Sequence, residues 1–106
     1  MPKYLVQASY TSEGVKGVSK EGGSSRRAAV EKLAESLGGK VEAFYFAFGD
    51  TDVFVIADLP DNVSAAAVGL ATNASGTVNV KTTVLLTPEE IDAAAKKQTA
   101  FRAAGQ

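Results

Sequence analysis

The sequence of 106 residues contains no cysteine and no histidine. Without cysteine, the chain can form no disulfide, thiolate nucleophile or thiolate metal site. Without histidine, it can hold no Ser-His-Asp relay, imidazole general base or histidine-ligated zinc. We therefore expect neither a metal nor another cofactor. Acid–base chemistry would have to come from Tyr, Asp and Glu side chains.

Blocks of one charge and long apolar runs are also missing. The net charge is −1, and Lys and Arg are scattered along the chain. Electrostatics therefore argues against nucleic acid or an anionic membrane as a partner. No apolar run approaches the roughly 18 residues that a membrane span needs, and no apolar signal region precedes the first predicted strand. A cytoplasmic location is the default expectation.

What remains is the composition of an ordinary globular protein. Apolar residues make up 45% and charged residues 22% of the chain. We expect a single domain over residues 1–106, since this length suffices for one core. A chain of this size buries only about two thirds of the surface that its unfolded form exposes.

Alternating β-forming residues predict four strands. The predicted strands cover residues 3–10, 41–48, 53–59 and 77–86. The turn composition of Gly49 to Asp52 makes the second and third strands a hairpin. In the fourth strand the residues predicted to point inward are Val78, Val80, Val84 and Leu86.

One helix is predicted between the first two strands, after a segment whose structure is left open. Residues 11–14 form either a turn or the first turn of a short helix. The break at residues 22–25 supplies serines as N-cap candidates. After it, apolar residues recur at helical spacing, at Val30, Leu33, Ala34 and Leu37. Gly38 and Gly39 end that helix.

Two more helices follow the hairpin and the last strand. An alanine-rich helix begins at residues 60–62 and ends at 73–76, and Val63, Ala67 and Leu70 lie on one side of it. Thr87-Pro88-Glu89-Glu90 contains a capping box with proline at the first helical position. It predicts a C-terminal helix from Pro88 to about Arg102.

The element order is β-α-β-β-α-β with one added helix. This order predicts a ferredoxin-like α+β fold, in which right-handed crossovers place the helices on one face of an antiparallel sheet. The other face is left bare, and half-wet strands should alternate apolar and polar residues. The two hairpin strands do not, because both of their faces are apolar.

This excess of apolar residues predicts a partner. We expect a homodimer formed through the bare sheet face by Phe44, Phe46, Phe54 and Ile56. Burying these four and one neighbouring apolar side chain contributes on the order of 7–15 kcal/mol before the costs of binding. The C-terminal helix could strap the partner. The alternative is that this helix folds over its own sheet.

Several stretches resemble the GYD domain family. The stretches are Tyr10-Thr11-Ser12-Glu13-Gly14-Val15-Lys16, Gly38-Gly39-Lys40, residues 44–53, Pro60-Asp61 and Ser75-Gly76. The resemblance covers residues 3–86 and implies a ferredoxin-like fold of the dimeric α/β-barrel kind. Gly49 and Asp52 match the family's Gly-Tyr-Asp signature, but Thr51 replaces its tyrosine, so no role carries over from that residue. Related families include cofactor-independent monooxygenases, isomerase-like enzymes and effector-binding modules, so the fold does not select among them.

One candidate binding site lies where the first strand meets the first helical turn. Tyr10, Thr11 and Glu13 lie at this point, and backbone N–H groups there could hold an anion with help from Arg26 or Arg27. The alternative is ordinary helix capping on a solvated surface. The glycines nearby do not have the spacing of a phosphate-binding loop.

Four other residues are candidates. Asp50 and Asp52 could hold a hard cation or share a raised pKa, but turn chemistry also explains them. Tyr45 could place its hydroxyl in a pocket between sheet and helices, or be a core tyrosine with one hydrogen bond. Asp58 is a charge in an apolar strand, which marks either a site or a strand end that reaches water.

Three functions follow from this sequence. The first is a homodimeric module that binds a small, partly apolar ligand between sheet and helices. The second is a cofactor-independent enzyme, of monooxygenase or isomerase type, that relies on Tyr45, Tyr10 or a carboxylate. The third is a structural or regulatory protein without a pocket. Lack of histidine and cysteine favours the first over the second.

Overall fold

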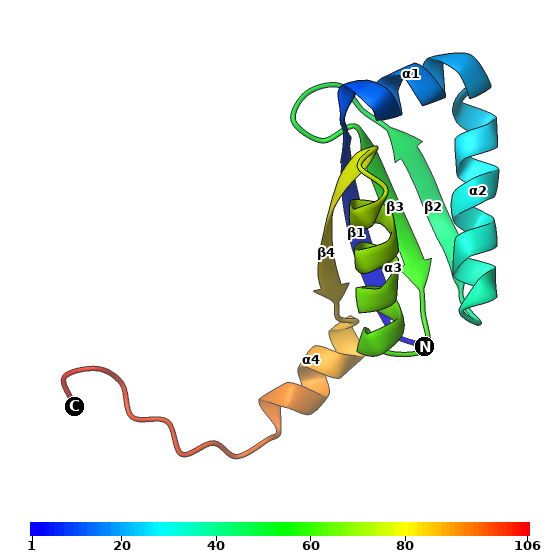
Figure 1. Cartoon of the computed structure of the whole chain (residues 1–106). Helices are drawn as coiled ribbons and strands as arrows, with labels where there is room; N and C mark the ends of the chain where they lie inside the picture. The colour runs from blue at the N-terminus through cyan, green and yellow to red at the C-terminus, as the bar shows by residue number, and fades with distance from the viewer.

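The computed structural model describes all of residues 1–106 and contains four strands and four helices (Figure 1). The elements are β1 (Lys3–Tyr10), α1 (Ser12–Glu21), α2 (Gly23–Ser36), β2 (Lys40–Phe46), β3 (Val53–Asp58), α3 (Asn62–Ala74), β4 (Val78–Leu85) and α4 (Pro88–Ala95). The strands form one antiparallel sheet in the order β2-β3-β1-β4. The predicted α+β, ferredoxin-like fold is confirmed. No helix is both long and apolar enough to cross a membrane.

The core lies between the sheet and helices α2 and α3. Tyr4 and Leu59 are its largest fully buried side chains, and they pack with Ala34 of α2 and Ala65 of α3. A second cluster follows β3, where Val53, Val55 and Ala57 are buried. Cross-strand pairing places Val78, Val80 and Val84 of β4 on the helix face, as predicted, but Val84 is 51% exposed there. Leu86 lies beyond the strand and is also exposed.

The segment after β1 is a full helix and not a turn. Thr11 caps α1 by accepting a hydrogen bond from the Gly14 N–H at 3.3 Å. The helix continues for ten residues to Glu21 and ends at Gly22, whose φ of +87° favours glycine. Gly22 also precedes α2 as its N-cap, so the serines at 24 and 25 do not cap that helix.

Helix α3 uses a different face from the predicted one. Ala65 is buried and Val68 half-buried against the Tyr4 cluster, whereas Val63 and Leu70 are 78% and 74% exposed. The rotation of the helix is fixed at its start, where the Tyr4 hydroxyl donates to Asn62 Oδ1 at 2.7 Å. Small side chains then face the sheet and let the helix approach it closely.

A β-bulge in β2 changes which side chains share a face. The β2–β3 register shifts between Val41 and Ala43, so one residue, Glu42, is unpaired. As a result Phe44 and Phe46 pair with Val55 and Val53 on the helix face. The face without helices, here called the open face, carries instead a cluster of Leu5, Ala43, Tyr45, Phe54 and Ile56. The prediction that Phe44 and Phe46 share a face with Phe54 and Ile56 is therefore wrong.

The C-terminal arm, residues 87–106, projects away from the rest of the chain (Figure 1). Its capping box is present as predicted: Thr87 N–H donates to Glu90 at 2.9 Å, and Glu90 N–H donates to Thr87 at 3.1 Å. Helix α4 ends at Ala95, short of the predicted Arg102, and residues 88–102 are all exposed. The arm does not fold over its own sheet. It raises the radius of gyration to 16.9 Å, whereas a compact domain of this length has about 13 Å.

Candidate functional site

Helix α1 lies across one end of the sheet and is anchored mainly at its first turn. Thr11 N–H donates to the Thr77 carbonyl at 3.0 Å, and the Thr11 hydroxyl donates to the Gly76 carbonyl at 2.9 Å. Gly14 is buried because the helix approaches the start of β4 here; a Cβ at this position would lie 2.0 Å from the Thr77 carbonyl oxygen. The remainder of α1 buries no further residue. Space is therefore left beneath the helix.

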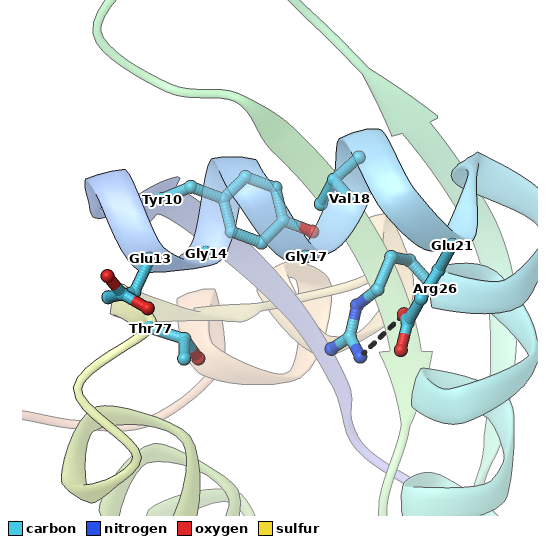
Figure 2. Close-up of a pocket in the computed structure, with 8 residues that line it drawn as sticks. All are labelled: Tyr10, Glu13, Gly14, Gly17, Val18, Glu21, Arg26 and Thr77. Carbon is cyan, nitrogen blue, oxygen red and sulfur yellow. Dashed lines mark ion pairs between the residues drawn. The ribbon is translucent and has the colours of Figure 1, made fainter.

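A polar cavity of about 170 Å³ lies beneath α1 on one side of Tyr10 (Figure 2). It is lined by Tyr10, Glu13, Gly14, Gly17, Val18, Glu21, Arg26 and Thr77. Figure 2 shows the Tyr10 ring lying along α1, with its hydroxyl directed toward the Val18 and Arg26 end of the cavity. No atom lies within 4 Å of a Cβ built on Gly17, so the missing side chain leaves this part of the cavity open.

A second cavity, apolar and of about 270 Å³, also borders Tyr10. It is lined by Tyr10, Val15, Val18, Ser19, Phe46, Ala47, Phe48 and Asp52. The two cavities share Tyr10 and Val18 in their linings, so they are neighbours beside α1, and the pair is here called the groove under α1. Phe48 is fully exposed at the apolar end, and Phe46 is partly exposed there.

The charges at the polar end are partly paired. An Arg26 guanidinium nitrogen lies 3.7 Å from a Glu21 carboxylate oxygen, and Glu13 lies 3.6 Å from Lys16 (Figure 2 shows the Arg26 pair). Both pairs are open to solvent, so each contributes little to stability. The cavity itself is lined by two carboxylates and one guanidinium. It can therefore offer hydrogen-bond donors and acceptors of both charges to a ligand.

The predicted site at the end of β1 is brought together in part. Tyr10, Glu13 and Arg26 line the same cavity. Thr11 does not line it, because its side chain caps α1 and bonds Gly76. The N–H groups of Gly14 and Val15 are also used within the helix cap. The helix cap thus occupies two of the backbone donors that the sequence suggested for an anion.

The two aspartates of the hairpin, Asp50 and Asp52, have different surroundings. Asp52 accepts the Tyr10 backbone N–H at 2.8 Å and lines the apolar cavity, whereas the Asp50 side chain is exposed in the turn. No three acidic side chains gather closely enough to hold a metal ion. Tyr45 does not lie between sheet and helices: it is on the open face and 70% exposed. The reason is the bulge at Glu42, which reverses the face of each later residue of β2.

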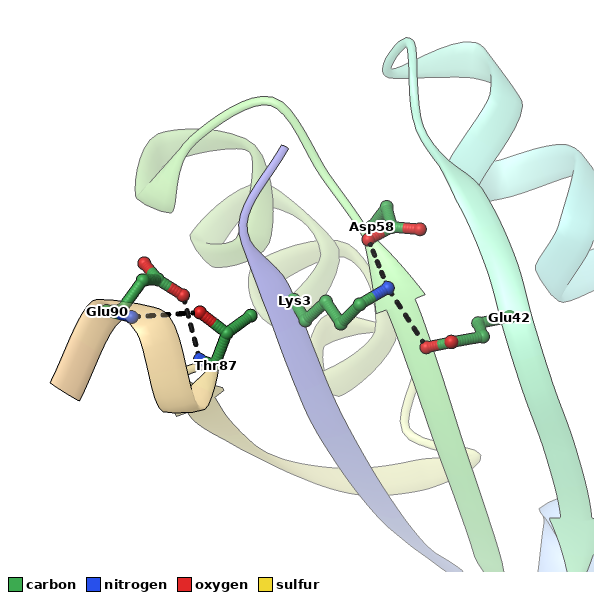
Figure 3. Close-up of polar contacts among 5 residues, drawn as sticks. All are labelled: Lys3, Glu42, Asp58, Thr87 and Glu90. Carbon is green, nitrogen blue, oxygen red and sulfur yellow. Dashed lines mark hydrogen bonds and ion pairs between the residues drawn. The ribbon is translucent and has the colours of Figure 1, made fainter. Parts of the chain in front are cut away.

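Asp58 lies far from both cavities and is a structural ion-pair residue. It is buried on β3, and its carboxylate lies 2.9 Å from the Lys3 ammonium, which also lies 3.1 Å from Glu42 (Figure 3). These two hydrogen bonds, to Asp58 first and then to Glu42, raise the pKa of Lys3 above 10.5. The charge in the apolar strand is thus explained by its partner on β1.

Sequence reasoning missed several residues of the groove. They are Gly17, Val18, Glu21, Phe48 and Thr77. Gly17, Val18 and Glu21 follow from the length of α1, which could have been inferred from the Thr11 cap and the acidic residue Glu13 in the first turn. Thr77 enters only through the pairing of β1 with β4.

Comparison with known protein families gives one assignment. A search of curated proteins finds no match. The model of the GYD domain family matches residues 4–95, which is most of the chain. The matched range includes all of the sheet except Lys3, as well as α1 and both cavities, and it ends with α4. The chain therefore belongs to the GYD domain family.

Proposed function

We propose that this GYD domain chain is a homodimeric module that binds a small, partly apolar molecule in the groove under α1. The observation that carries the ligand site is the adjacency of the polar and apolar cavities, which share Tyr10 and Val18 in their linings. The two together reach the lower end of the few hundred Å³ that small-molecule sites occupy. The ligand would place its apolar part against Phe46 and Phe48 and its polar part near Arg26 and Glu13.

The weak packing of α1 supports a role in binding. After Gly14, the helix buries no residue, and the apolar surface of Val15 is half-exposed. A ligand in the groove would cover this surface and hold α1 to the sheet. Elements with few buried contacts are those that open at low free-energy cost, which gives a ligand access.

The open face supports pairing with a second copy. Tyr45 and Phe54 are exposed there and lie next to Ile56, Leu5 and Ala43. The chain exposes 7380 Å², whereas a compact monomer of this mass exposes about 5,600 Å². The excess, about 1,800 Å², is what one subunit buries in a large homodimer interface. The exposed C-terminal arm contributes to this excess.

The enzymatic alternative has less support. Tyr45 lies outside the groove and Asp58 is paired with Lys3, which leaves Tyr10, Glu13, Glu21 and Asp52 as the groove's acid–base groups, and Glu21 and Asp52 already have partners in Arg26 and the Tyr10 N–H. The alternative without a pocket is disfavoured by the groove itself. Binding is therefore the function that the geometry supports best.

Ligand binding is tested by filling the groove. Gly17→Leu adds a side chain where a Cβ meets no atom, so it should occupy the polar cavity without a clash; Gly69→Leu is the matched control, since Gly69 is also helical and unobstructed. The probe is 8-anilinonaphthalene-1-sulfonate, which has aromatic rings and one charged group. Its fluorescence titration should weaken at least several-fold in Gly17→Leu and remain unchanged in Gly69→Leu. Equal binding by both variants would overturn the groove as the site.

Pairing is tested by native mass spectrometry of the purified full chain. We expect a mass of twice the monomer, and an adduct released on denaturation would identify a bound ligand. Phe54→Lys introduces a charge in the centre of the open face and should give monomer. Val63→Lys changes an equally apolar but outward residue of α3 and should leave the dimer intact. A wild-type monomer would refute the pairing and leave the groove proposal untouched.

A further inference from the structure

The acidic and basic residues of the C-terminal arm are separated into two blocks, and neither block forms an ion pair with the rest of the chain. Residues 88–95 contain Glu89, Glu90 and Asp92 and no base, whereas residues 96–106 contain Lys96, Lys97 and Arg102 and no acid. Three alanines, residues 93–95, separate the two blocks. None of these six charges takes part in an ion pair. Glu90 accepts the Thr87 N–H in the capping box and Arg102 donates to the Gln106 carbonyl oxygen, so only the other four have no polar partner.

Interactions within one arm account for only part of this pattern. Acids near the start of α4 and lysines just after its end suit the helix dipole. That effect, however, leaves every charge in water and gives no cover to Ile91, which is half-exposed. Asp92 and Lys96 have the spacing of an intrahelical pair, but α4 ends between them and no ion pair forms.

The arm of a second copy could supply both the opposite charges and the cover for Ile91. In a two-fold symmetric pair, the same patch of both copies meets, so that residue i contacts residue j and j contacts i. Two arms lying antiparallel and crossing near Ala94 would face the acidic block of each with the basic block of the other. The alanines at the crossing allow a close approach, and Ile91 of each copy would be covered.

We infer that the C-terminal arm is a self-complementary pairing element whose partner is the arm of a second copy of this chain. The inference rests on the proposed homodimer and adds a second contact to its open face. It also accounts for the arm's position: it extends beyond the sheet, with no residue from 88 to 102 buried on its own chain.

Charge reversal in trans tests this inference in the full chain. One variant, Lys96→Glu with Lys97→Glu, makes both blocks acidic; the other, Glu89→Lys with Asp92→Lys, makes both blocks basic while keeping the Glu90 cap. Each should raise the dimer dissociation constant about tenfold, since four or so exposed pairs become repulsive. Mixing the two variants should restore the wild-type constant, because both contacts of the heterodimer are then attractive. Failure of the mixture to recover would overturn the inference.

A cross-link gives an independent measurement. Because the chain has no cysteine, Ala94→Cys creates a single thiol at the expected crossing point. Air oxidation should yield a disulfide-linked dimer, whereas Ala71→Cys, exposed on α3, should not. If Phe54→Lys abolishes the dimer but neither arm test responds, the open-face pairing stands and the arm inference fails. If no variant or wild type pairs at all, the failure lies with the proposed homodimer.

Discussion

Lys3 and Asp58 are direct cross-strand partners, and their charged groups lie 2.9 Å apart at one end of the open face (Figure 3). Glu42, the residue left unpaired by the bulge, completes the group from β2. One lysine thus ties three strands together. Asp58 is the buried member, so its carboxylate depends on Lys3 for its counter-charge.

The first prediction concerns alkaline stability. Lys3 binds its proton more tightly in the folded state, because hydrogen bonds to Asp58 and Glu42 raise its pKa above 10.5. Its contribution to stability is therefore complete below pH 10.5 and is lost as the pH rises through the higher folded value. Lys3→Met should be less stable than wild type at neutral pH, and the difference should shrink in strongly alkaline buffer. Thermal melts across this range measure it.

The matched control for that experiment is Lys32→Met. Lys32 is exposed on α2 and has no ion pair. The melting temperature of the Lys32→Met variant should equal that of wild type at every pH. If Lys3→Met also tracks wild type throughout, the ion group does not stabilise the sheet.

The second prediction contrasts two glycines of α1. A Cβ at Gly14 would meet the Thr77 carbonyl oxygen at 2.0 Å, whereas a Cβ at Gly17 meets nothing within 4 Å. Gly14→Ala should destabilise the fold by about 1–3 kcal/mol or more, since backbone must move. Gly17→Ala should be neutral or stabilise by up to about 1 kcal/mol, because alanine favours the helix. Urea unfolding of both variants checks this, and equal stabilities would show that α1 does not rest on Thr77.

The fold could be predicted from the sequence where local signals were strong. The strands of alternating residues, the glycines after α2 and the Thr87 capping box all led to the observed elements. These signals act within a few residues, so they need no knowledge of the tertiary structure. The element order then restricted the topology to the observed sheet.

Which side chains share a face was harder to predict. The bulge at Glu42 appears only in the pairing of β2 with β3, and it places Tyr45 on the open face and not in the expected pocket. The rotation of α3 depends on the contact between Tyr4 and Asn62, which are 58 residues apart. Long-range contacts of this kind leave no periodic signal in either segment.

The third prediction concerns the contact that orients α3. Tyr4 is fully buried, and its hydroxyl donates to Asn62 Oδ1 at 2.7 Å. Tyr4→Phe keeps the ring and removes this hydrogen bond, so we expect a loss of about 0.5–1.5 kcal/mol in the free energy of unfolding. Leu59→Ala, which opens a cavity in the same cluster, should cost about 2–5 kcal/mol. A Tyr4→Phe variant as unstable as Leu59→Ala would mean that the hydroxyl does more than orient the helix.

The last prediction concerns acid stability at the start of α3. Asp61 caps this helix: its carboxylate accepts the Ser64 backbone N–H at 2.8 Å, and that bond first, then the Ser64 hydroxyl, lowers its pKa below 3.8. The ionised cap therefore stabilises the fold fully above pH 3.8, and the contribution is lost as the pH falls through the lower folded value.

Two substitutions at Asp61 distinguish the contribution of the capping hydrogen bond from that of the ionised carboxylate. Asparagine caps helices about as well as aspartate but does not titrate, whereas alanine does neither. Asp61→Asn should match wild type at neutral pH and fall less steeply in acid. Asp61→Ala should be less stable at neutral pH, with a deficit that narrows as the wild-type carboxylate is protonated. Urea titrations at neutral and acidic pH test both, and parallel acid profiles for wild type and Asp61→Asn would contradict a role for the ionised cap, because only the wild-type residue can gain a proton.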